Sequence, residues 1–200
     1  MPLPFYITAS YYDFLERALI NVKKEPITQV CNWTGDISEI KPEHSPDRQY
    51  QATAQTPLVY HLYGLEDYPE TMVLSEDDYI NFLIKVISNT NALNPIVPLS
   101  LQGKLTESQL LLLGYQLNDW DFRILFRFLL KFRRKERQML ERGLVIQLKA
   151  LNKREIGNAD KTLDYLRDYY DQENFEVKWK KVQTFIRELW KEWNSDGQEK

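Results

Sequence analysis

The stretch Gln109–Arg127, QLLLLGYQLNDWDFRILFR, decides the fold of this chain. Its four leucines, residues 110–113, are followed by Gly114, and a short apolar run that ends at a glycine is typical of a buried strand in a parallel sheet. Asn118 stands where a helix N-cap is expected, and from Trp120 onward the apolar pattern is helical. A strand, a glycine turn and a helix N-terminus form the usual nucleotide crevice of open α/β sheets. We therefore expect an α/β fold with such a crevice after this strand.

Strands and helices alternate along the rest of the chain. Apolar or alternating runs predict strands at residues 5–8, 27–33, 58–63, 71–74, 144–148 and 175–179. Helical spacing predicts helices after Ser10 and Ser75, each of which opens an S-x-x-D capping box, and over residues 120–132, 158–170 and 182–193. Pro95 and Pro98 predict short turns. This alternation predicts a three-layer, Rossmann-like and mainly parallel sheet with helices on both faces.

One α/β domain is expected over residues 1–200, a length that allows a substantial core. Residues 34–57 are polar and have no period, which is typical of a functional lid or of a bland or disordered loop, and we favour the second interpretation. Residues 150–200 are expected to complete the domain as helix, strand and helix.

Composition narrows the class of protein. The net charge of −3 argues against a general nucleic-acid binder. Cys31 is the only cysteine, which excludes an internal disulfide and fits a reducing cytoplasm. No apolar run reaches the roughly 18 residues that a membrane helix needs, and the N-terminus carries no signal-peptide pattern. We therefore expect a cytoplasmic protein that does not enter the membrane.

Three motifs occur in order along the chain. They are YITASYYDFLERAL at 6–19, VYHLYGLEDYPETMVLSEDDY at 59–79 and LLLLGYQLNDWDFRILFR at 110–127. On these motifs the chain resembles the sirtuin-like domain of bacterial NAD-consuming, anti-phage defence proteins, over roughly residues 5–149. The resemblance implies a domain that binds NAD on a Rossmann-type sheet. The resemblance also implies the reaction of the family's active members, which is cleavage of the nicotinamide–ribose bond.

The chain departs from that family at the positions that the resemblance links to chemistry. The Gly-rich phosphate loop at the family's N-terminus has no match. Ser10 stands at the position of an Asn, and Tyr63 at that of a His that acts as a base. Gln116 replaces a Ser that contacts the nucleotide, whereas Asp119 matches the family pattern. A neutral Tyr with a reference pKa of about 10 is a poor base at neutral pH, so we assign no catalytic residue.

Two functions follow from this mixture of retained and replaced residues. The first is a catalytically degenerate sirtuin-like module, which acts by protein interaction or by binding NAD or ADP-ribose in bacterial defence or signalling. The alternative is an NAD hydrolase that an upstream segment or a partner chain completes. Between these we lean towards a protein that is not an enzyme by itself.

Candidate nucleotide contacts are assigned after the leucine strand and at His61 of the strand at 58–63. Gly114, Gln116 and Asp119 are the candidates after the leucine strand, weighed against a hydrogen-bonded turn without a ligand. His61 lies two residues, about 7 Å, before the family's base position, and a satisfied buried histidine is the favoured interpretation over a catalytic one. One Cys and two His at unhelpful spacing give no metal ligand set.

The first predicted helix carries polar residues that we interpret as structural. Ser10 is expected to cap this helix rather than to act as a nucleophile, because no base can be identified by spacing. Asp13 and Glu16 are expected to be dipole partners and surface charges rather than a catalytic carboxylate pair.

Three predicted helices carry apolar faces that we expect to pack in the core. The faces consist of Phe14, Leu15, Ala18, Leu19 and Val22; of Ile80, Leu83, Ile84 and Ile87; and of Val182, Phe185, Ile186, Leu189, Trp190 and Trp193. The two tryptophans of the last helix leave room for an interface.

A protein partner or self-association is expected. Without the family's first strand, the sheet has an open edge that invites association, so we expect the chain not to be a clean monomer. A basic cluster is interpreted as a solvated helix end, with contact to nucleic acid or to an acidic partner as the minor alternative. It consists of Lys131, Arg133, Arg134, Lys135 and Arg137.

Overall fold

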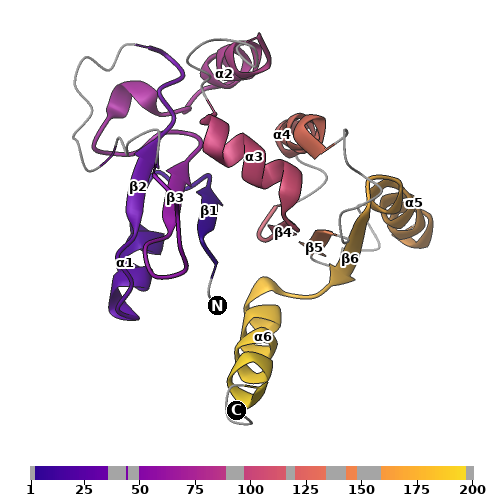
Figure 1. Ribbon diagram of the computed structural model, residues 1–200. Coiled ribbons are helices and arrows are strands. Elements are labelled where there is room, and N and C mark those ends of the chain that lie inside the picture. The colour runs from indigo at the N-terminus through magenta and orange to yellow at the C-terminus, as the bar shows by residue number, and fades with distance from the viewer. Residues whose placement is uncertain are drawn as a thin grey trace. The chain divides into compact units, whose positions relative to one another are not determined.

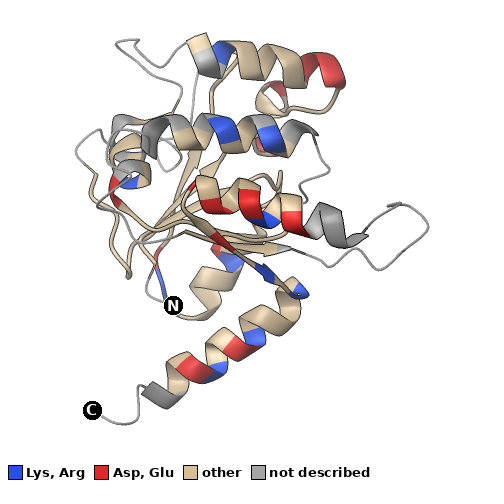
Figure 2. Cartoon of the chain, turned by 90° about the vertical axis from the view of Figure 1, so that its right-hand side faces the viewer, with Lys and Arg blue, Asp and Glu red and all other residues tan. Residues whose placement is uncertain are grey.

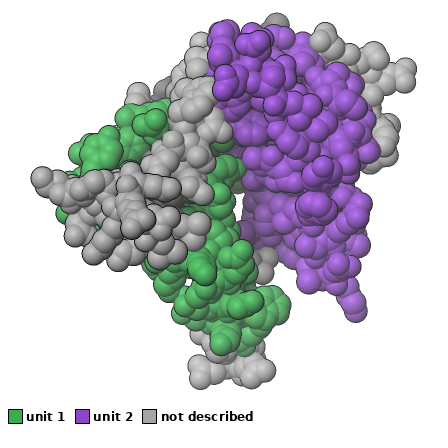
Figure 3. Space-filling model, turned by 180° about the vertical axis from the view of Figure 1, so that it is seen from behind, with its two compact units in different colours: residues 1, 103–200 green, residues 2–102 purple. Residues whose placement is uncertain are grey.

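The computed structural model describes residues 3–35, 44, 50–88, 97–115, 120–133, 143–147 and 159–196. The chain divides into two compact units, residues 2–102 and residues 103–200 with residue 1, which Figure 3 distinguishes by colour. Each unit is described by itself, and the single domain expected over residues 1–200 stays a prediction. Both units combine a three-stranded parallel sheet with helices, which confirms the α/β, Rossmann-like class.

The sheet of the unit formed by residues 2–102 has the strand order β1-β3-β2. It consists of β1 (Phe5–Thr8), β2 (Ile27–Val30) and β3 (Leu58–His61). The central strand β3 lies between β1 and β2 and is parallel to both (Figure 1). In this register His61 pairs with Thr8 on one side and with Val30 on the other. The carboxyl ends of all three strands therefore lie at one edge of the sheet.

Helical elements of this unit that are described in full are α1 (Phe14–Asn21), the short 3-10 helix η2 (Pro69–Thr71) and α2 (Glu76–Ser88). The strand predicted at residues 71–74 is wrong. Pro69 stands in the first turn of η2, where its missing N–H costs nothing, and the chain closes a helical turn there instead of pairing with the sheet. The strands predicted at 27–33 and 58–63 exist but end at Val30 and His61.

The two predicted capping boxes have opposite outcomes. The box at the start of α2 is confirmed, because Ser75 N–H donates to Asp78 Oδ2 at 3.0 Å and Asp78 N–H donates to Ser75 Oγ at 3.1 Å. The box at Ser10 is wrong. Helix α1 begins only at Phe14, with Asp13 at the N-cap position and no side-chain cap.

The predicted core face of α1 is confirmed at Leu19 but not at its two ends. Glu16 and Leu19 are the buried residues of this helix, whereas Phe14 and Val22 are exposed. The physical reason is that the Glu16 carboxylate bonds to side chains of β2 and β3, which turns its side of the helix towards the sheet. On α2, Leu83 is buried as expected, but Ile80 and Ile84 are exposed.

The sheet of residues 103–200 has the strand order β4-β5-β6, again parallel. It consists of β4 (Leu111–Leu112), β5 (Gly143–Gln147) and β6 (Phe175–Trp179). The predicted leucine strand is confirmed as a parallel strand, although it is only two residues long. The half-exposed strand predicted at 175–179 is confirmed at an edge of this sheet.

Four helices belong to the second half of the chain: α3 (Leu99–Glu107), α4 (Trp120–Arg133), α5 (Ala159–Gln172) and α6 (Val182–Asp196). Helix α3 was missed, since Pro95 and Pro98 suggested only turns. Its signal is the pair Leu101 and Leu105, which are one helical turn apart and both buried.

The core of residues 103–200 is aromatic. It joins β4, β5 and β6 to α4 and α5 and consists of Leu112, Phe122, Phe126, Leu130, Val145, Tyr170 and Phe175. The ring of Phe126 lies 5.1 Å from that of Phe175 and 5.2 Å from that of Tyr170, both edge to face. Gly143 leaves room for this packing, because a Cβ there would lie 2.2 Å from the Phe175 ring.

Helix α6 does not bury its apolar face as expected. Phe185 is buried, but Ile186, Trp190 and Trp193 are 41%, 57% and 49% exposed. Acidic and basic residues alternate along the rest of the helix (Figure 2). The helix therefore contacts its own unit by a narrow stripe around Phe185 and leaves a tryptophan face on the surface.

Candidate functional site

The carboxyl edge of the β1-β3-β2 sheet brings together two of the predicted site positions. Ser10 lies two residues after β1, and Tyr63 lies two residues after β3. The strands are adjacent and parallel, with Thr8 opposite His61, so both positions follow the same edge of the sheet. Ligands of open α/β sheets bind outside the carboxyl ends of the strands, and this edge is our candidate site.

Gly64 shapes the chain where it leaves β3. Its φ is +92°, and a Cβ at this position would lie 2.4 Å from the main-chain oxygen of Thr71. That oxygen accepts a hydrogen bond from Trp33 Nε1 at 2.7 Å. Thr71 Oγ1 donates to the carbonyl of Tyr68 at 2.6 Å and accepts from Leu65 N–H at 3.3 Å. The tract after Tyr63 is thus folded tightly back on itself and needs glycine at residue 64.

Tyr63 is held in an aromatic cluster. Its hydroxyl donates to Tyr79 Oη at 3.3 Å, and its ring meets the rings of Tyr79 and Phe82 edge to face at 5.7 and 5.3 Å. Its main-chain oxygen accepts from Val73 N–H at 3.1 Å. A neutral phenol has no lone pair basic enough to take a proton at neutral pH. The position that the resemblance assigns to a base therefore carries a packed, hydrogen-bonded aromatic side chain.

Ser10 forms a local turn instead of a helix cap. Its N–H donates to Thr8 Oγ1 at 3.0 Å, and its Oγ accepts from Tyr12 N–H at 3.1 Å. These contacts close the chain between β1 and α1. The hydroxyl thus bonds to the main chain of Tyr12 through both its oxygen and its proton, and the expectation that Ser10 is not a nucleophile stays a prediction.

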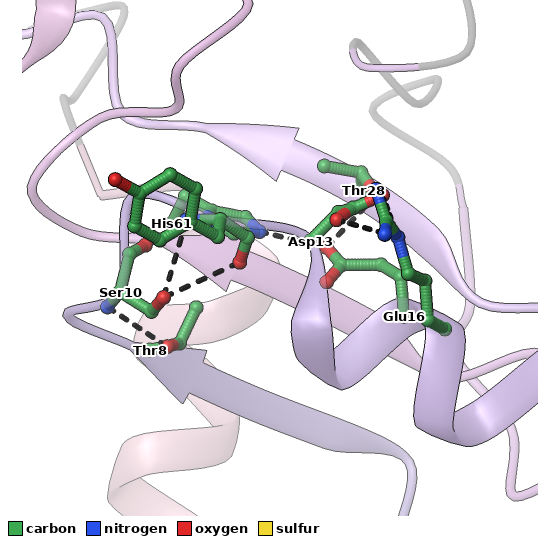
Figure 4. Close-up of polar contacts among 8 residues, drawn as sticks. Thr8, Ser10, Asp13, Glu16, Thr28 and His61 are labelled. Carbon is green, nitrogen blue, oxygen red and sulfur yellow. Dashed lines mark hydrogen bonds and ion pairs between the residues drawn. The ribbon is translucent and has the colours of Figure 1, made fainter.

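His61 lies beneath this turn and has no exposed surface. Its Nδ1 lies 3.0 Å from the carbonyl oxygen of Ser10, and its Nε2 lies 2.7 Å from Glu16 Oε1 (Figure 4). Thr28 Oγ1 donates to the same carboxylate oxygen at 3.0 Å. The expectation of a satisfied buried histidine is confirmed, and the expectation that Glu16 is a surface charge is wrong, because Glu16 is only 6% exposed.

This arrangement of serine, histidine and glutamate is not a catalytic triad. His61 contacts the main-chain oxygen of Ser10, while Ser10 Oγ faces Tyr12. A carbonyl oxygen only accepts hydrogen bonds, so Nδ1 carries the proton and cannot remove one from a nucleophile. Nucleophilic catalysis requires the base within hydrogen-bond reach of the hydroxyl, and the geometry excludes it here.

Sequence reasoning missed Glu16 and Thr28 as members of this cluster. The signal for Glu16 was its place among apolar residues, one turn before Leu19 on the side of α1 that faces the sheet. For Thr28 there was no signal, since a threonine in a strand is ordinary. The contact between these two side chains depends on how α1 lies on the sheet.

Tyr11 and Asp78 add polar groups beside this edge. Tyr11 Oη donates to the carbonyl of Val73 at 2.5 Å, and Glu66 N–H donates to the carbonyl of Tyr11 at 2.9 Å. Burial, and then the charge of Asp78, raise the pKa of Tyr11. The main-chain N–H of Ser75, followed by its hydroxyl side chain, lowers the pKa of Asp78. Tyr11 thus stays a neutral donor and Asp78 a carboxylate.

Cys31 is unsuited to chemistry. It is completely buried, and burial raises the pKa of its thiol to about 12, although a hydrogen bond with Tyr60 acts in the opposite direction. Burial also raises the pKa of Tyr60 well above its ordinary value. A thiol that stays protonated is neither a nucleophile nor a metal ligand at neutral pH.

The second predicted edge is described only in part. Gly114 has a φ of +80° and open space around it, so the turn needs glycine for its conformation. Tyr115 stacks on Phe122 at 4.6 Å. Gln116 and Asp119 lie outside the described residues, and the nucleotide contact predicted for them stays a prediction.

The basic cluster and the polar loop also fall largely outside the described residues. Lys131 and Arg133 belong to the last turn of α4, whereas Arg134, Lys135 and Arg137 are not described. Of the loop predicted at 34–57, residues 36–43 and 45–49 are not described, and residues 50–56 form a turn in which Tyr50 Oη donates to the carbonyl of Thr56.

In the described ranges, no three His, Cys, Asp or Glu side chains lie close enough to hold a metal ion together. Likewise, no helix of this part of the chain has the length and apolar character to cross a bilayer.

Comparison with known proteins gave one family match. The family model described as SIR2-like domain matches residues 4–183, which is most of the chain. A comparison with curated proteins found no match.

Proposed function

Because the chain belongs to the family of SIR2-like domains, we propose that it is a sirtuin-like module that lacks catalytic activity of its own. SIR2-like domains are in general NAD-binding. The proposed role is to bind NAD or ADP-ribose, or a protein partner, in a bacterial defence or signalling system within the cytoplasm.

The state of Tyr63 carries this proposal. This residue stands at the edge where the resemblance places the catalytic base, and it is fixed by Tyr79 and Phe82. A general base contributes about 100- to 10,000-fold in rate, so its replacement by a neutral phenol removes most of the chemistry.

Neither histidine of the chain is placed to substitute for that base. His61 is buried and points with Nδ1 at a main-chain oxygen. His44 Nδ1 lies 3.1 Å from Tyr68 Oη, and the two rings meet edge to face at 5.7 Å. Both imidazoles are engaged in contacts within the fold.

Retained nucleotide binding is supported by the scaffold. The β1–β3 edge keeps its parallel register, and Gly64 keeps the sharp exit from β3. We propose NAD or ADP-ribose as the ligand, with Gly114, Gln116 and Asp119 as candidate contacts.

Protein contact is supported by the exposed face of α6. Ile186, Trp190 and Trp193 are each more than two-fifths exposed, and tryptophan is enriched in the cores of interfaces. We propose that this tryptophan face takes part in self-association.

Light scattering across concentrations tests this self-association. The double variant Trp190→Gln, Trp193→Gln should remain monomeric at concentrations where the natural chain associates. A natural chain that is monomeric at every concentration contradicts the proposal.

The main test measures chemistry and binding separately. Nicotinamide release from NAD is followed with the purified chain, and calorimetric titration measures the affinity for NAD and ADP-ribose. The expected result is saturable binding, weakened by Asp119→Ala, without release of nicotinamide. Catalytic release that Tyr63→Phe abolishes would contradict the proposal. The alternative is a hydrolase completed by an upstream segment or a partner chain, and release that starts on adding that component would favour it.

A further inference from the structure

Hydrogen bonds link α1 to the strands β2 and β3 and to the turn that follows β1. Thr28 of β2 donates to Glu16 of α1 at 3.0 Å, and Glu16 contacts His61 of β3 at 2.7 Å. His61 contacts the carbonyl of Ser10, which follows β1, at 3.0 Å (Figure 4). One carboxylate and one imidazole thus connect four consecutive elements of the fold.

The directions of these bonds are fixed by the groups themselves. The Ser10 carbonyl cannot donate, so His61 Nδ1–H is the donor. On the other side of the ring, one proton lies between Nε2 and Glu16 Oε1, whichever atom holds it. The imidazole therefore has a single orientation that satisfies both nitrogens, and it points one N–H at the Ser10 turn.

Hydrogen bonds of Tyr11 connect the Ser10 turn to the tract that follows Gly64. The carbonyl of Tyr11 accepts from Glu66 N–H, and Tyr11 Oη donates to the carbonyl of Val73. Glu66 and Val73 lie in the tract that follows Tyr63 and Gly64. The orientation of His61 thus determines where both loops of the candidate site begin.

Stability alone is a poor reason for this arrangement. Replacing a buried ionic or hydrogen-bonded pair with apolar side chains of similar volume is often neutral or stabilising. Glu16 Oε2 is also buried and has no hydrogen-bond partner among the described residues, which costs free energy. A hydrogen-bonded pair fixes the orientation of its two side chains, which apolar packing does not do.

We propose that Glu16 and His61 are a positioning pair for the nucleotide-binding edge, with Thr28 orienting the carboxylate. The pair fixes the Ser10 turn and, through Tyr11, the tract after Gly64. Both side chains are buried, so neither touches the ligand. The nucleotide part of this inference rests on the proposed function, whereas the control of the Ser10 turn does not.

Nuclear magnetic resonance of the natural chain gives the first test. Nitrogen-15 shifts of the His61 ring should report a protonated Nδ1, with a slowly exchanging proton. An unprotonated Nδ1 in the folded protein would overturn the inference, and this measurement requires no variant.

Hydrogen exchange in variants gives the second test. In Glu16→Gln, His61→Gln and the milder Thr28→Val, the amides of Ser10 and Glu66 should exchange about ten-fold faster, within the coupling range of contacting residues. The amide of Phe82 in α2 should be unchanged.

Thr28→Val, which removes one hydroxyl, keeps the test valid if the other variants fail to fold. The matched control is Asp13→Asn, which neutralises a carboxylate of the same segment that pairs with the exposed Arg17. Unchanged Ser10 and Glu66 amides in folded Thr28→Val and Glu16→Gln would overturn the inference.

Titration with ADP-ribose tests the role of the pair in nucleotide binding separately from its control of the Ser10 turn. If the natural chain binds, affinity should fall about ten-fold in Glu16→Gln and not in Asp13→Asn. If the natural chain does not bind, the binding part of the proposed function fails, and the exchange data decide the role of the pair. Binding that is equal in Glu16→Gln and in the natural chain would contradict the positioning of the nucleotide edge.

Discussion

Glu16 Oε1 and His61 Nε2 lie 2.7 Å apart, although the two residues are separated by 45 positions in the sequence. Both side chains are buried, at 6% and 0% exposure. This contact sets the direction of α1 on the sheet and occupies the histidine that lies nearest in sequence to the expected base position. The contact therefore holds His61 beneath the candidate site, with both ring nitrogens engaged within the fold.

Removal of one member of this pair should be costly. Glu16→Ala is expected to lower the free energy of unfolding by about 3–5 kcal/mol, because His61 then remains buried without its partner. Asp13→Ala should cost less than about 1 kcal/mol, since its pair with Arg17 is exposed. Urea unfolding of both variants measures the difference. Equal losses would mean that the buried pair contributes no more than a surface pair.

Gly64 should not tolerate a side chain. Gly64→Ala places a Cβ 2.4 Å from the Thr71 oxygen at a φ of +92°, so we expect loss of the folded state or a large fall in melting temperature. Gly35 has a similar φ of +80° but open space around it. Gly35→Ala should therefore cost only about 1 kcal/mol from the backbone conformation. Equal melting temperatures for the two variants would contradict the close approach of Gly64 to Thr71.

Gly143 should also be sensitive to a side chain, for a different reason. Its conformation is open to any residue, but a Cβ would lie 2.2 Å from the buried Phe175 ring. Gly143→Ala should cost about 1–3 kcal/mol through overpacking. Gly103→Ala, in the helix α3 with nothing within 4 Å, should instead stabilise by about 0.5–1 kcal/mol. Denaturant midpoints that shift in the same direction would count against this packing.

The cap of α2 should make stability depend on pH. Hydrogen bonds from Ser75 lower the pKa of Asp78 below its ordinary value of 3.8 in the folded state. Its contribution is therefore present above pH 3.8 and is lost as the pH falls through the folded pKa. Asp78→Ala should destabilise at neutral pH, and the difference from the natural chain should shrink in acid. Asp77→Ala, which removes a neighbouring carboxylate of the same helix turn, is the control when both variants are unfolded with urea.

Restoring the family residues should restore chemistry if the proposed loss is correct. The double variant Ser10→Asn, Tyr63→His supplies the amide and the imidazole that the resemblance assigns to these positions. We expect it to raise nicotinamide release by about 100-fold or more over the natural chain, the lower end of general-base catalysis. Tyr63→Phe is the control and should stay inactive. An inactive double variant that still binds NAD would show that other missing parts limit the reaction.

Local patterns were enough for the elements whose contacts are local. The strand at Phe5–Thr8, the strand at Phe175–Trp179 and the Ser75–Asp78 cap were predictable, because each depends on side chains within a few residues. The Ser10 cap failed although its motif is the same, because Ser10 bonds to Thr8 and Tyr12 before the helix starts.

The chain's class and family were contained in the sequence itself. Alternating apolar runs predicted parallel strands and helices, and three motifs indicated the SIR2-like family that residues 4–183 match. These properties depend on spacing along the chain, which the sequence records directly.

The tertiary structure alone decided what surrounds each side chain. It turned Glu16 inward, placed Thr28 and His61 on either side of its carboxylate, and left Trp190 and Trp193 on the surface. The physical reason is that burial and pairing depend on strand register and on the rotation of a helix about its axis. Both are set by contacts between residues far apart in sequence, where no local pattern carries the information.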